Sequence, residues 1–386
     1  MRVIYISKTC SSETFDELYQ KSIKKPQQQD QKFHQMLIEG FVQNNIFVEA
    51  ISSRPINRTN MKKVWFWGRK EKKDALNYHY LFFINVKILR QVSLMASLTW
   101  ILLWMLPKQR KETVIYCDIL NLSLSTVTNF MARLFHVKHV AIVTDLPNEL
   151  EYVSPRFKTK ATQIAQKYTG YVMLTESMNT HINPNQKPHI VIEGMIKKEA
   201  VTMPVEKFKP FTFLYAGGLS ESSNILVLIQ AFLKANLNDS QLLICGDGAL
   251  SNEVKTFAAN ETIQYLGSKP NREVVELEKK SHILVNPRSK NERQTKFAFP
   301  SKIMEYLNSG TPVLSTKLEG IPEEYFDYLY EIEDETEQGF IDKLTWLKSL
   351  NTSELNQRGH LGKQFVNTYK TNTLMASKII AWSATL

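Results

Sequence analysis

The sequence predicts an α/β protein with two domains, each built on a parallel β-sheet with helices on both faces. Strand-like and helix-like segments alternate along the whole chain, which is typical of such sheets. A length of 386 residues, with 43% hydrophobic and 22% charged residues, allows two separate cores. The charged, proline-containing segment 197–210 reads as the hinge. We therefore expect a first domain over 1–205 and a second over 206–369.

Short apolar runs in the first half predict six strands. They span 2–7, 46–52, 113–117, 139–144, 170–174 and 189–192. Between the first two, apolar residues recur at helical spacing and predict a helix over 29–44. His34 lies on this helix, where a histidine is more often a solvated or satisfied side chain than a catalytic one.

The charge balance indicates an acidic partner. The net charge is +10 and the isoelectric point is about 9.2, which fits nucleic acid, anionic lipid or a diphosphate ligand. No helix-turn-helix, zinc-finger or RNP motif accompanies the charge, so lipid and nucleotide are favoured and nucleic acid is not expected. Cys10, Cys117 and Cys245 lie far apart, which predicts neither a disulfide framework nor a zinc site and fits a reducing cytoplasm.

Two segments bear on a membrane. The start of the chain reads as a strand and not as a secretory signal. The apolar run 92–106 is shorter than the roughly 20 residues that a spanning helix needs, so we expect a buried or partly interfacial helix, the buried form being favoured.

A basic insertion follows the second strand. It surrounds Trp65, Phe66 and Trp67 with Arg54, Arg58, Lys62, Lys63, Arg69, Lys70, Lys72 and Lys73. Cations beside tryptophans are typical of a peripheral contact with an anionic membrane surface. A solvated charged loop whose aromatic side chains pack on the domain fits the same residues equally well.

The segment 286–320 contains the most informative helix. It is expected to begin at 299–301, where proline presets the first turn and Ser301 can cap free N–H groups, and to end before Gly310. Three apolar residues give it one buried face, so Ser301, Lys302 and Glu305 share the other face near the positive end of the helix dipole. A capped surface helix with a Lys/Glu pair is the plainer interpretation.

The chemistry of that helix start suits a sugar nucleotide. Free N–H groups, the helix dipole and Lys302 together form an anion site, whereas the Glu305 carboxylate is better matched to hydroxyl groups. A second phosphate-binding feature is the turn Gly217–Gly218 after the strand 211–216, because glycines let backbone N–H groups approach a diphosphate. Gly246 closes the next strand.

Five ordered segments resemble glycosyltransferase family 4, the retaining enzymes of the GT-B fold, in the form found in bacterial exopolysaccharide and capsule transferases. They are FPSKIMEYLNSGTPVL at 299–314, FLYAGGLSESSNILVLIQAF at 213–232, LLICGDG at 242–248, YLGS at 265–268 and ILVNPRSKNE at 283–292. The resemblance implies two Rossmann-like domains facing each other across a cleft. It also implies a diphosphate at the helix start, ribose on Glu305, nucleotide contacts at Gly246, and a last helix over about 370–386 that returns to the first domain.

The sequence departs from the family pattern at the diphosphate. Relatives usually carry an Arg at the position of Gly218 and a Lys at that of Ser223. The opposite side of the expected site is rich in cations, namely Arg288, Lys290, Arg293, Lys296 and Lys302. We expect Arg288 and Lys302 to bind the diphosphate, since a dianion that leaves water needs charged or N–H partners.

The sugar contacts are less regular. The glutamate that holds the transferred sugar in relatives is replaced by Phe297, and Glu292 on the same loop is the candidate in its place. In the first domain, Asp145 follows a predicted strand, where it could contact the transferred sugar or the acceptor hydroxyl. Asp145 could equally cap the following turn.

The predicted function is a metal-independent, retaining hexosyltransferase at the cytoplasmic face of the membrane. It would move a sugar from a UDP-sugar or dTDP-sugar to a lipid-linked (polyprenyl-diphosphate) saccharide, without a cofactor. The sequence contains no Asp-x-Asp pair of the kind that holds a metal on a sugar nucleotide. Two alternatives stay open, a sugar-nucleotide epimerase of the same fold and a non-catalytic GT-B subunit; a homo-oligomer or a partner transferase is also possible.

Overall fold

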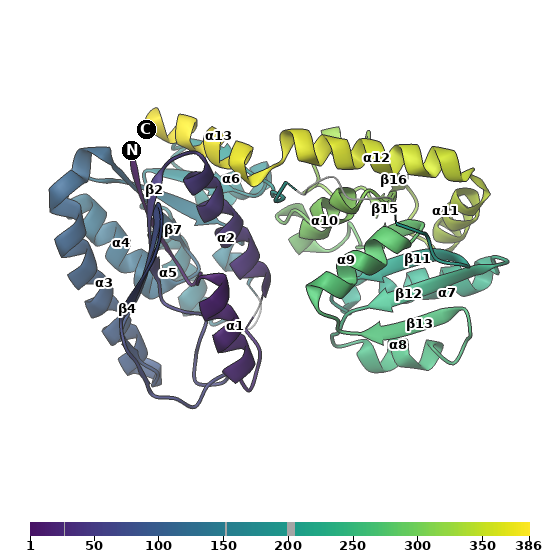
Figure 1. The fold of residues 1–386 in the computed structure, drawn as a ribbon, viewed down its shortest axis with the longest axis horizontal. Coiled ribbons are helices and arrows are strands. Elements are labelled where there is room, and N and C mark those ends of the chain that lie inside the picture. The colour runs from purple at the N-terminus through teal and green to yellow at the C-terminus, as the bar shows by residue number, and fades with distance from the viewer. Residues whose placement is uncertain (27, 151–152, 199–204) are drawn as a thin grey trace. The chain divides into compact units, whose positions relative to one another are not determined.

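The computed structural model describes residues 1–26, 28–150, 153–198 and 205–386, and the chain divides into two compact units (Figure 1). Unit 1 comprises Met1–Lys197 and Asn372–Leu386, and unit 2 comprises Lys198–Thr371. Each unit has its own mainly parallel sheet with helices packed on it. The predicted class, two Rossmann-like α/β domains, is confirmed.

The main sheet of unit 1 has the strand order β10-β9-β8-β7-β1-β2-β5-β4 in the described residues. Its strands are β1 (Arg2–Ser7), β2 (Phe47–Ser52), β4 (Arg69–Lys73), β5 (Leu76–Tyr80), β7 (Thr113–Asp118), β8 (Lys138–Val143), β9 (Gly170–Met173) and β10 (His189–Val191). All neighbours are parallel except β4 and β5, which form an antiparallel hairpin at one edge. The six predicted strands are present within one or two residues at their ends. The sequence did not predict β4 and β5, which lie in and just after the basic insertion.

A second, two-stranded antiparallel sheet joins β3 (Trp65–Phe66) to β6 (Phe83–Ile84). The helices of unit 1 are α1 (Ser12–Lys21), α2 (Gln28–Gln43), α3 (Lys87–Gln109), α4 (Leu122–Leu134), α5 (Pro155–Ala165), α6 (Glu176–Ile182) and α13 (Asn372–Ala384). Short 3-10 helices occur at η1 (Arg110–Glu112) and η2 (Pro147–Glu149) in unit 1, and at η3 (Glu221–Ser223), η4 (Arg293–Lys296) and η5 (Glu323–Tyr325) in unit 2.

The last helix of the chain, α13, belongs to unit 1, where it packs against α2 (Figure 1). The Asn372 side chain donates a hydrogen bond to the Met36 carbonyl at 3.2 Å. Gly40 allows this close approach, because a Cβ there would overlap the Asn372 carbonyl. His34 on α2 is buried, with its Nδ1 2.6 Å from the Tyr5 hydroxyl, so it is a satisfied structural residue.

Helix α3 is longer and more exposed than the sequence predicted. It has 23 residues, and by length and composition alone Lys87–Pro107 could cross a membrane. Its inner face is a row of leucines repeating every fourth residue, Leu94, Leu98, Leu102 and Leu106, each 1% exposed or less. The outer face leaves Trp100 and Trp104 more than 60% exposed. The favoured expectation of a buried helix is wrong, because the face opposite the leucines is exposed.

The sheet of unit 2 is parallel throughout, in the order β13-β12-β11-β14-β15-β16. Its strands are β11 (Phe211–Ala216), β12 (Ser240–Cys245), β13 (Ile263–Gly267), β14 (Ile283–Asn286), β15 (Val313–Thr316) and β16 (Leu329–Ile332). Its helices are α7 (Ile225–Ala235), α8 (Ser251–Phe257), α9 (Asn271–Lys280), α10 (Ser301–Ser309), α11 (Glu337–Ser349) and α12 (Thr352–Tyr369). The strand order reverses between β11 and β14, and ligands of such sheets bind beyond the carboxyl ends of the strands at this switch point.

Candidate functional site

The start of α10 offers unpartnered backbone donors. The helix begins at Ser301, is preceded by Pro300 at the cap position, and has no side-chain cap. Ile303 donates its N–H to the Pro300 carbonyl at 2.9 Å, while in the described chain the N–H groups of Ser301 and Lys302 have no acceptor. Ser301 is therefore the first helical residue and not the cap that the sequence suggested. Free N–H groups with the positive end of the helix dipole favour an anion.

Lys302 carries a half-buried ammonium group without a hydrogen-bonding partner among the described residues. Its Nζ lies 5.4 Å from the centre of the Tyr215 ring. Burial lowers the pKa of Lys302 to about 8, although the nearby carboxylates of Glu305 and Glu278 act in the opposite direction. A cation kept in this position is desolvated without a direct counter-ion contact, so an anionic ligand would stabilise it.

Arg288 supplies a second cation from a different loop. It follows β14, and its carbonyl accepts a hydrogen bond from the Thr316 hydroxyl. Its guanidinium is half-buried and makes no hydrogen bond or ion pair within the described residues. Burial lowers the pKa of Arg288, while Tyr215 and Glu292 raise it. Arg288 and Lys302 therefore both lie within electrostatic range of one side chain, Tyr215.

Glycines in two turns allow the loops that carry Tyr215 and Lys302 to pack closely. We call Tyr215, Lys302 and Arg288, with the residues packed on them, the cation group. Tyr215 donates its hydroxyl hydrogen to the Gly218 carbonyl at 2.6 Å. A Cβ at Gly217 would clash with the Lys302 ammonium and lie 2.6 Å from the Tyr215 hydroxyl oxygen. Gly246 has φ +149°, and a Cβ there would overlap the Gly217 carbonyl. Gly217 and Gly246 are required by this packing, whereas Gly218 is exposed with open space around it.

Three residues of the group were missed by sequence reasoning. Tyr215 looks like an ordinary strand residue, and burial raises its pKa to about 12. Tyr306 accepts a hydrogen bond from the Ala216 N–H at 2.9 Å and so ties α10 to β11. Glu278 resembles one more charge of a surface helix in the sequence, yet it is 1% exposed. Only the charge pattern of α9, which leaves one glutamate on its apolar face, could have indicated its burial.

The other predicted residues of unit 2 are placed as follows. Glu305 is half-buried on α10 and its charge reaches Lys302. Glu292 is exposed and its charge reaches Arg288. Lys296 forms an ion pair with Glu319 at 3.1 Å, so its charge is already paired with a carboxylate. The side chain of Arg293 lies outside the described residues.

The remaining predicted site residues differ in how they are placed. Asp145 belongs to unit 1, where it is exposed just beyond the end of β8. Ser223, at the position where the family has a lysine, donates its hydroxyl hydrogen to the Ser220 carbonyl at 2.5 Å. It therefore closes its own turn. It also lies near the Tyr215 hydroxyl and acts to lower the pKa of Tyr215, against the larger effect of burial.

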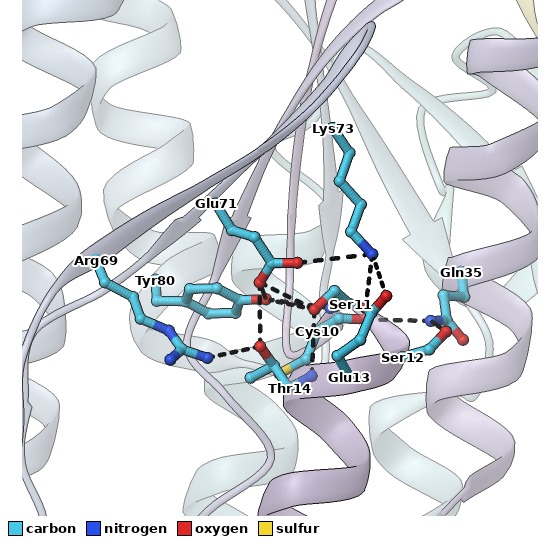
Figure 2. A network of polar contacts seen from close by, with 10 residues as sticks. All are labelled: Cys10, Ser11, Ser12, Glu13, Thr14, Gln35, Arg69, Glu71, Lys73 and Tyr80. Carbon is cyan, nitrogen blue, oxygen red and sulfur yellow. Dashed lines mark hydrogen bonds and ion pairs between the residues drawn. The ribbon is translucent and has the colours of Figure 1, made fainter.

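The corresponding edge of unit 1 is a closed polar network centred on Glu71 (Figure 2). One oxygen of Glu71, Oε2, accepts hydrogen bonds from Ser11 Oγ at 3.0 Å, Thr14 Oγ1 at 3.1 Å and Tyr80 Oη at 3.0 Å. Arg69 donates to Thr14 Oγ1 at 2.6 Å. The network ties β4 to the first turn of α1, and its polar groups satisfy one another.

The Arg54 side chain is also buried and hydrogen-bonded within unit 1. It is 7% exposed, and its guanidinium donates to the carbonyls of Phe66, Trp67 and Leu81. Burial lowers the pKa of Arg54 to about 10. This arginine, predicted as part of a basic surface, instead holds the β3 and β6 segments to the sheet.

Residues 210–349, which lie in unit 2, match the protein family described as Glycosyl transferases group 1. No curated protein sequence matches the chain.

Three solved structures that resemble the whole chain illustrate its fold. Sucrose-phosphate synthase from Thermosynechococcus elongatus has a TM-score of 0.66 and 11% identity, with 98% of this chain and 97% of that chain covered. Anabaena HepE in complex with UDP and glucose has a TM-score of 0.63 and 11% identity, with both chains fully covered. The apo form of the lipopolysaccharide outer core galactosyltransferase WaaB has a TM-score of 0.63 and 14% identity, with 99% of each chain covered. The chain therefore has the GT-B fold.

Proposed function

We propose that the protein is a retaining glycosyltransferase that uses a nucleoside diphosphate sugar, UDP- or dTDP-linked, as its donor. The observation that carries the proposal is a pair of half-buried cations that have no hydrogen-bonding partner in the described chain. They are Lys302, whose ammonium lies beside Gly217, and Arg288, which is within electrostatic range of Tyr215. A diphosphate supplies the two charges that would neutralise them. The match of residues 210–349 to the group 1 family and the UDP in the HepE structure support this choice of donor.

In this account the cations bind and stabilise the leaving group. As the bond between the sugar and the diphosphate breaks, negative charge grows on the diphosphate. Lys302, Arg288 and the free N–H groups at the start of α10 would stabilise this charge, which is electrostatic preorganisation. The carboxylate of Glu305 would accept hydrogen bonds from ribose hydroxyls, and Glu292 from the sugar. Asp145 is the proposed contact to the transferred sugar or the acceptor hydroxyl. Neither a metal ion nor a catalytic base is assigned.

The acceptor we propose is a lipid-linked saccharide, as in exopolysaccharide or capsule synthesis, at the cytoplasmic side of a membrane. The exposed apolar face of α3 supports a location at a membrane surface. Sugar-phosphate acceptors are the main alternative, since sucrose-phosphate and trehalose-phosphate synthases share the fold.

One assay tests the reaction. The purified protein is incubated with a panel of sugar nucleotides and either a polyprenyl-diphosphate saccharide or a sugar phosphate, and nucleotide release and product mass are followed together. Transfer to the lipid-linked saccharide is expected. Nucleotide-sugar epimerisation without release would identify an epimerase. Binding of UDP without any turnover would identify a non-catalytic subunit, the alternative that the Ser223 side chain favours because it is engaged in its own turn.

A further inference from the structure

Unit 1 exposes a set of large apolar side chains on α3 and in the neighbouring segment 65–67, which we call the α3 surface. Its members are Trp65, Trp67, Ile88, Leu89, Val92, Trp100, Leu103 and Trp104, each between 43% and 72% exposed. Single exposed apolar residues are common, but a group of this size marks an interaction site.

The aromatic residues of β3 are joined to α3 through β6. Trp65 and Trp67 stack on each other with ring centres 6.3 Å apart, and both pack on Phe82, at 6.3 and 5.4 Å. The Phe82 N–H in turn donates to the Ser97 hydroxyl on α3 at 3.1 Å. The tryptophans of the insertion and those of the helix therefore belong to one surface.

A groove with a cationic wall runs beside this surface, between α3 and the β4–β5 hairpin. Two adjoining cavities of about 470 and 670 Å³ share Lys70, His79, Trp104 and Met105 in their lining. Strand alternation turns Lys70 and Lys72 toward α3 and Glu71 toward α1.

The floor of the groove is neutralised internally, but its wall is not. Glu49 accepts from Arg2 at 3.2 Å and lies 2.6 Å from His79 Nε2. Lys70 and Lys72 are exposed and make no hydrogen bond or ion pair with any described residue. Two lysines without a partner among the described residues therefore line the same cavity as Trp104, at the edge of the α3 surface.

We propose that the α3 surface docks on an anionic phospholipid bilayer, with α3 lying along the membrane plane and Lys70 and Lys72 on lipid phosphates. Tryptophans prefer the depth of the headgroups, and lysines near an anionic leaflet each add to the attraction. An apolar helix face bordered by cations is the pattern of an interfacial helix.

The same contacts favour a helix that lies on the membrane over one that spans it. The inner leucines of α3 are buried in unit 1, and the Ser93 hydroxyl accepts a hydrogen bond from the Ile84 N–H of β6 at 3.0 Å. Insertion across the bilayer would break both sets of contacts. The inference deepens the proposed function, since a lipid-linked acceptor would be encountered at this surface, but it can be tested without catalysis.

The experiment measures co-sedimentation of the full chain with phosphatidylcholine vesicles, with or without phosphatidylglycerol. Binding is expected only with the anionic lipid and is expected to weaken as salt is added. The double variant Lys70→Gln/Lys72→Gln is expected to lose about tenfold or more in partitioning, at ~1 kcal/mol per lysine. Trp100→Ser/Trp104→Ser is expected to lose at least about tenfold, because binding scales with the apolar area buried.

Matched controls lie outside the surface. Lys160→Gln/Lys255→Gln removes the same charge from exposed sites on α5 and α8, and Trp346→Ser removes a tryptophan that is 43% exposed on α11. All of these variants are expected to keep UDP binding, which reports an intact unit 2. Unit 1 is checked through its thermal transition.

Four results would overturn the docking proposal. The first is no binding to anionic vesicles, and the second is equal binding by the surface variants and the control variants. The third is a dimer that Trp100→Ser/Trp104→Ser converts to a monomer while vesicle binding is unchanged. The fourth is resistance of the bound protein to extraction by high salt and alkali, which indicates a spanning helix. Loss of vesicle binding with sugar transfer to a soluble acceptor intact would reject only the docking surface. Vesicle binding without nucleotide binding would reject only the transferase.

Discussion

The two units differ in whether the charged side chains near the carboxyl ends of their strands have hydrogen-bonding partners. In unit 1 the carboxylate of Glu71 is surrounded by hydroxyl donors from α1 and β5, and the polar groups satisfy one another (Figure 2). In unit 2 the cations Lys302 and Arg288 are half-buried without such partners in the described chain. An unpaired buried charge lowers the stability of the fold. A chain that keeps such a charge is expected to use it in binding a ligand of opposite charge. From this comparison we interpret the first edge as structural and propose the second as the ligand site.

The largest expected effect comes from removing the cations of unit 2. Lys302→Ala and Arg288→Ala should each weaken UDP binding about 10- to 100-fold, because each removes charge-assisted hydrogen bonds worth ~1.5–3 kcal/mol. Isothermal titration calorimetry and donor kcat/KM measure the loss. Lys290→Ala is the control, a neighbouring exposed lysine whose backbone N–H, not its side chain, contacts Glu335. Equal affinity in all variants would remove the basis of the donor site.

The reciprocal change in unit 1 should alter stability without altering donor binding. Glu71→Gln replaces the charged acceptor of three hydroxyl groups, which should lower the free energy of unfolding of unit 1 by ~1–3 kcal/mol. Urea denaturation, with hydrogen exchange in α1 and β4, reports the change. Glu253→Gln, an exposed glutamate on α8, is the control. A loss of UDP affinity in Glu71→Gln would contradict the division between the two edges.

A third prediction concerns the stability cost of the Lys302 charge. The pKa of Lys302 is about 8 when folded and 10.5 in its ordinary range, so folding disfavours its protonated form. Below pH 8 the full cost is present, and between about pH 8 and 10.5 it is relieved as the folded protein loses the proton. Lys302→Met should therefore be more stable at pH 7 by ~1 kcal/mol, reduced for solvent screening, and this advantage should disappear near pH 10.5. Thermal unfolding across this pH range measures it; greater stability of the wild type at pH 7 would oppose the assignment.

The smallest expected effect is an increase in the affinity for UDP. Gly218 has open space where a side chain would point, so nothing in the packing requires glycine there. Gly218→Arg adds a cation at the rim of the proposed diphosphate site and should tighten UDP binding about 2- to 5-fold, as expected for a partly exposed pair. The gain should fall as salt is added. Gly218→Ala is the control, since it changes the backbone without adding charge. If Gly218→Arg binds UDP no better than Gly218→Ala, the diphosphate does not lie near this turn.

The sequence predicted features that depend on local signals. Helix α10 has proline at its start, Gly310 at its end and one apolar face, and it was placed to within a residue; only the capping role of Ser301 was wrong. The hairpin strand β4 was missed because its sequence, RKEKK, is charged on both faces, and its Glu71 is satisfied by α1, far away in the chain. The pairing of Lys302 with Tyr215 and the burial of Glu278 likewise depend on tertiary contacts that spacing does not encode.

The exposure of α3 shows a second limit. Hydrophobicity predicted a helix there, but both faces of the helix are apolar, so the sequence could not indicate which face packs on the unit. The leucine repeat at every fourth residue was the available signal, because it coincides with the buried row. Trp100 and Trp104 on the opposite face stay exposed, where they can contact the proposed membrane surface.

Proton uptake on UDP binding tests the central claim most directly. Calorimetry at pH 8 in buffers of different ionisation enthalpy gives the number of protons bound with each UDP. Because the pKa of Lys302 is about 8 and a bound diphosphate would raise it, the wild type should take up about half a proton per UDP and Lys302→Met essentially none. Equal uptake by both proteins, or UDP binding with no uptake by the wild type, would show that Lys302 is not at the diphosphate.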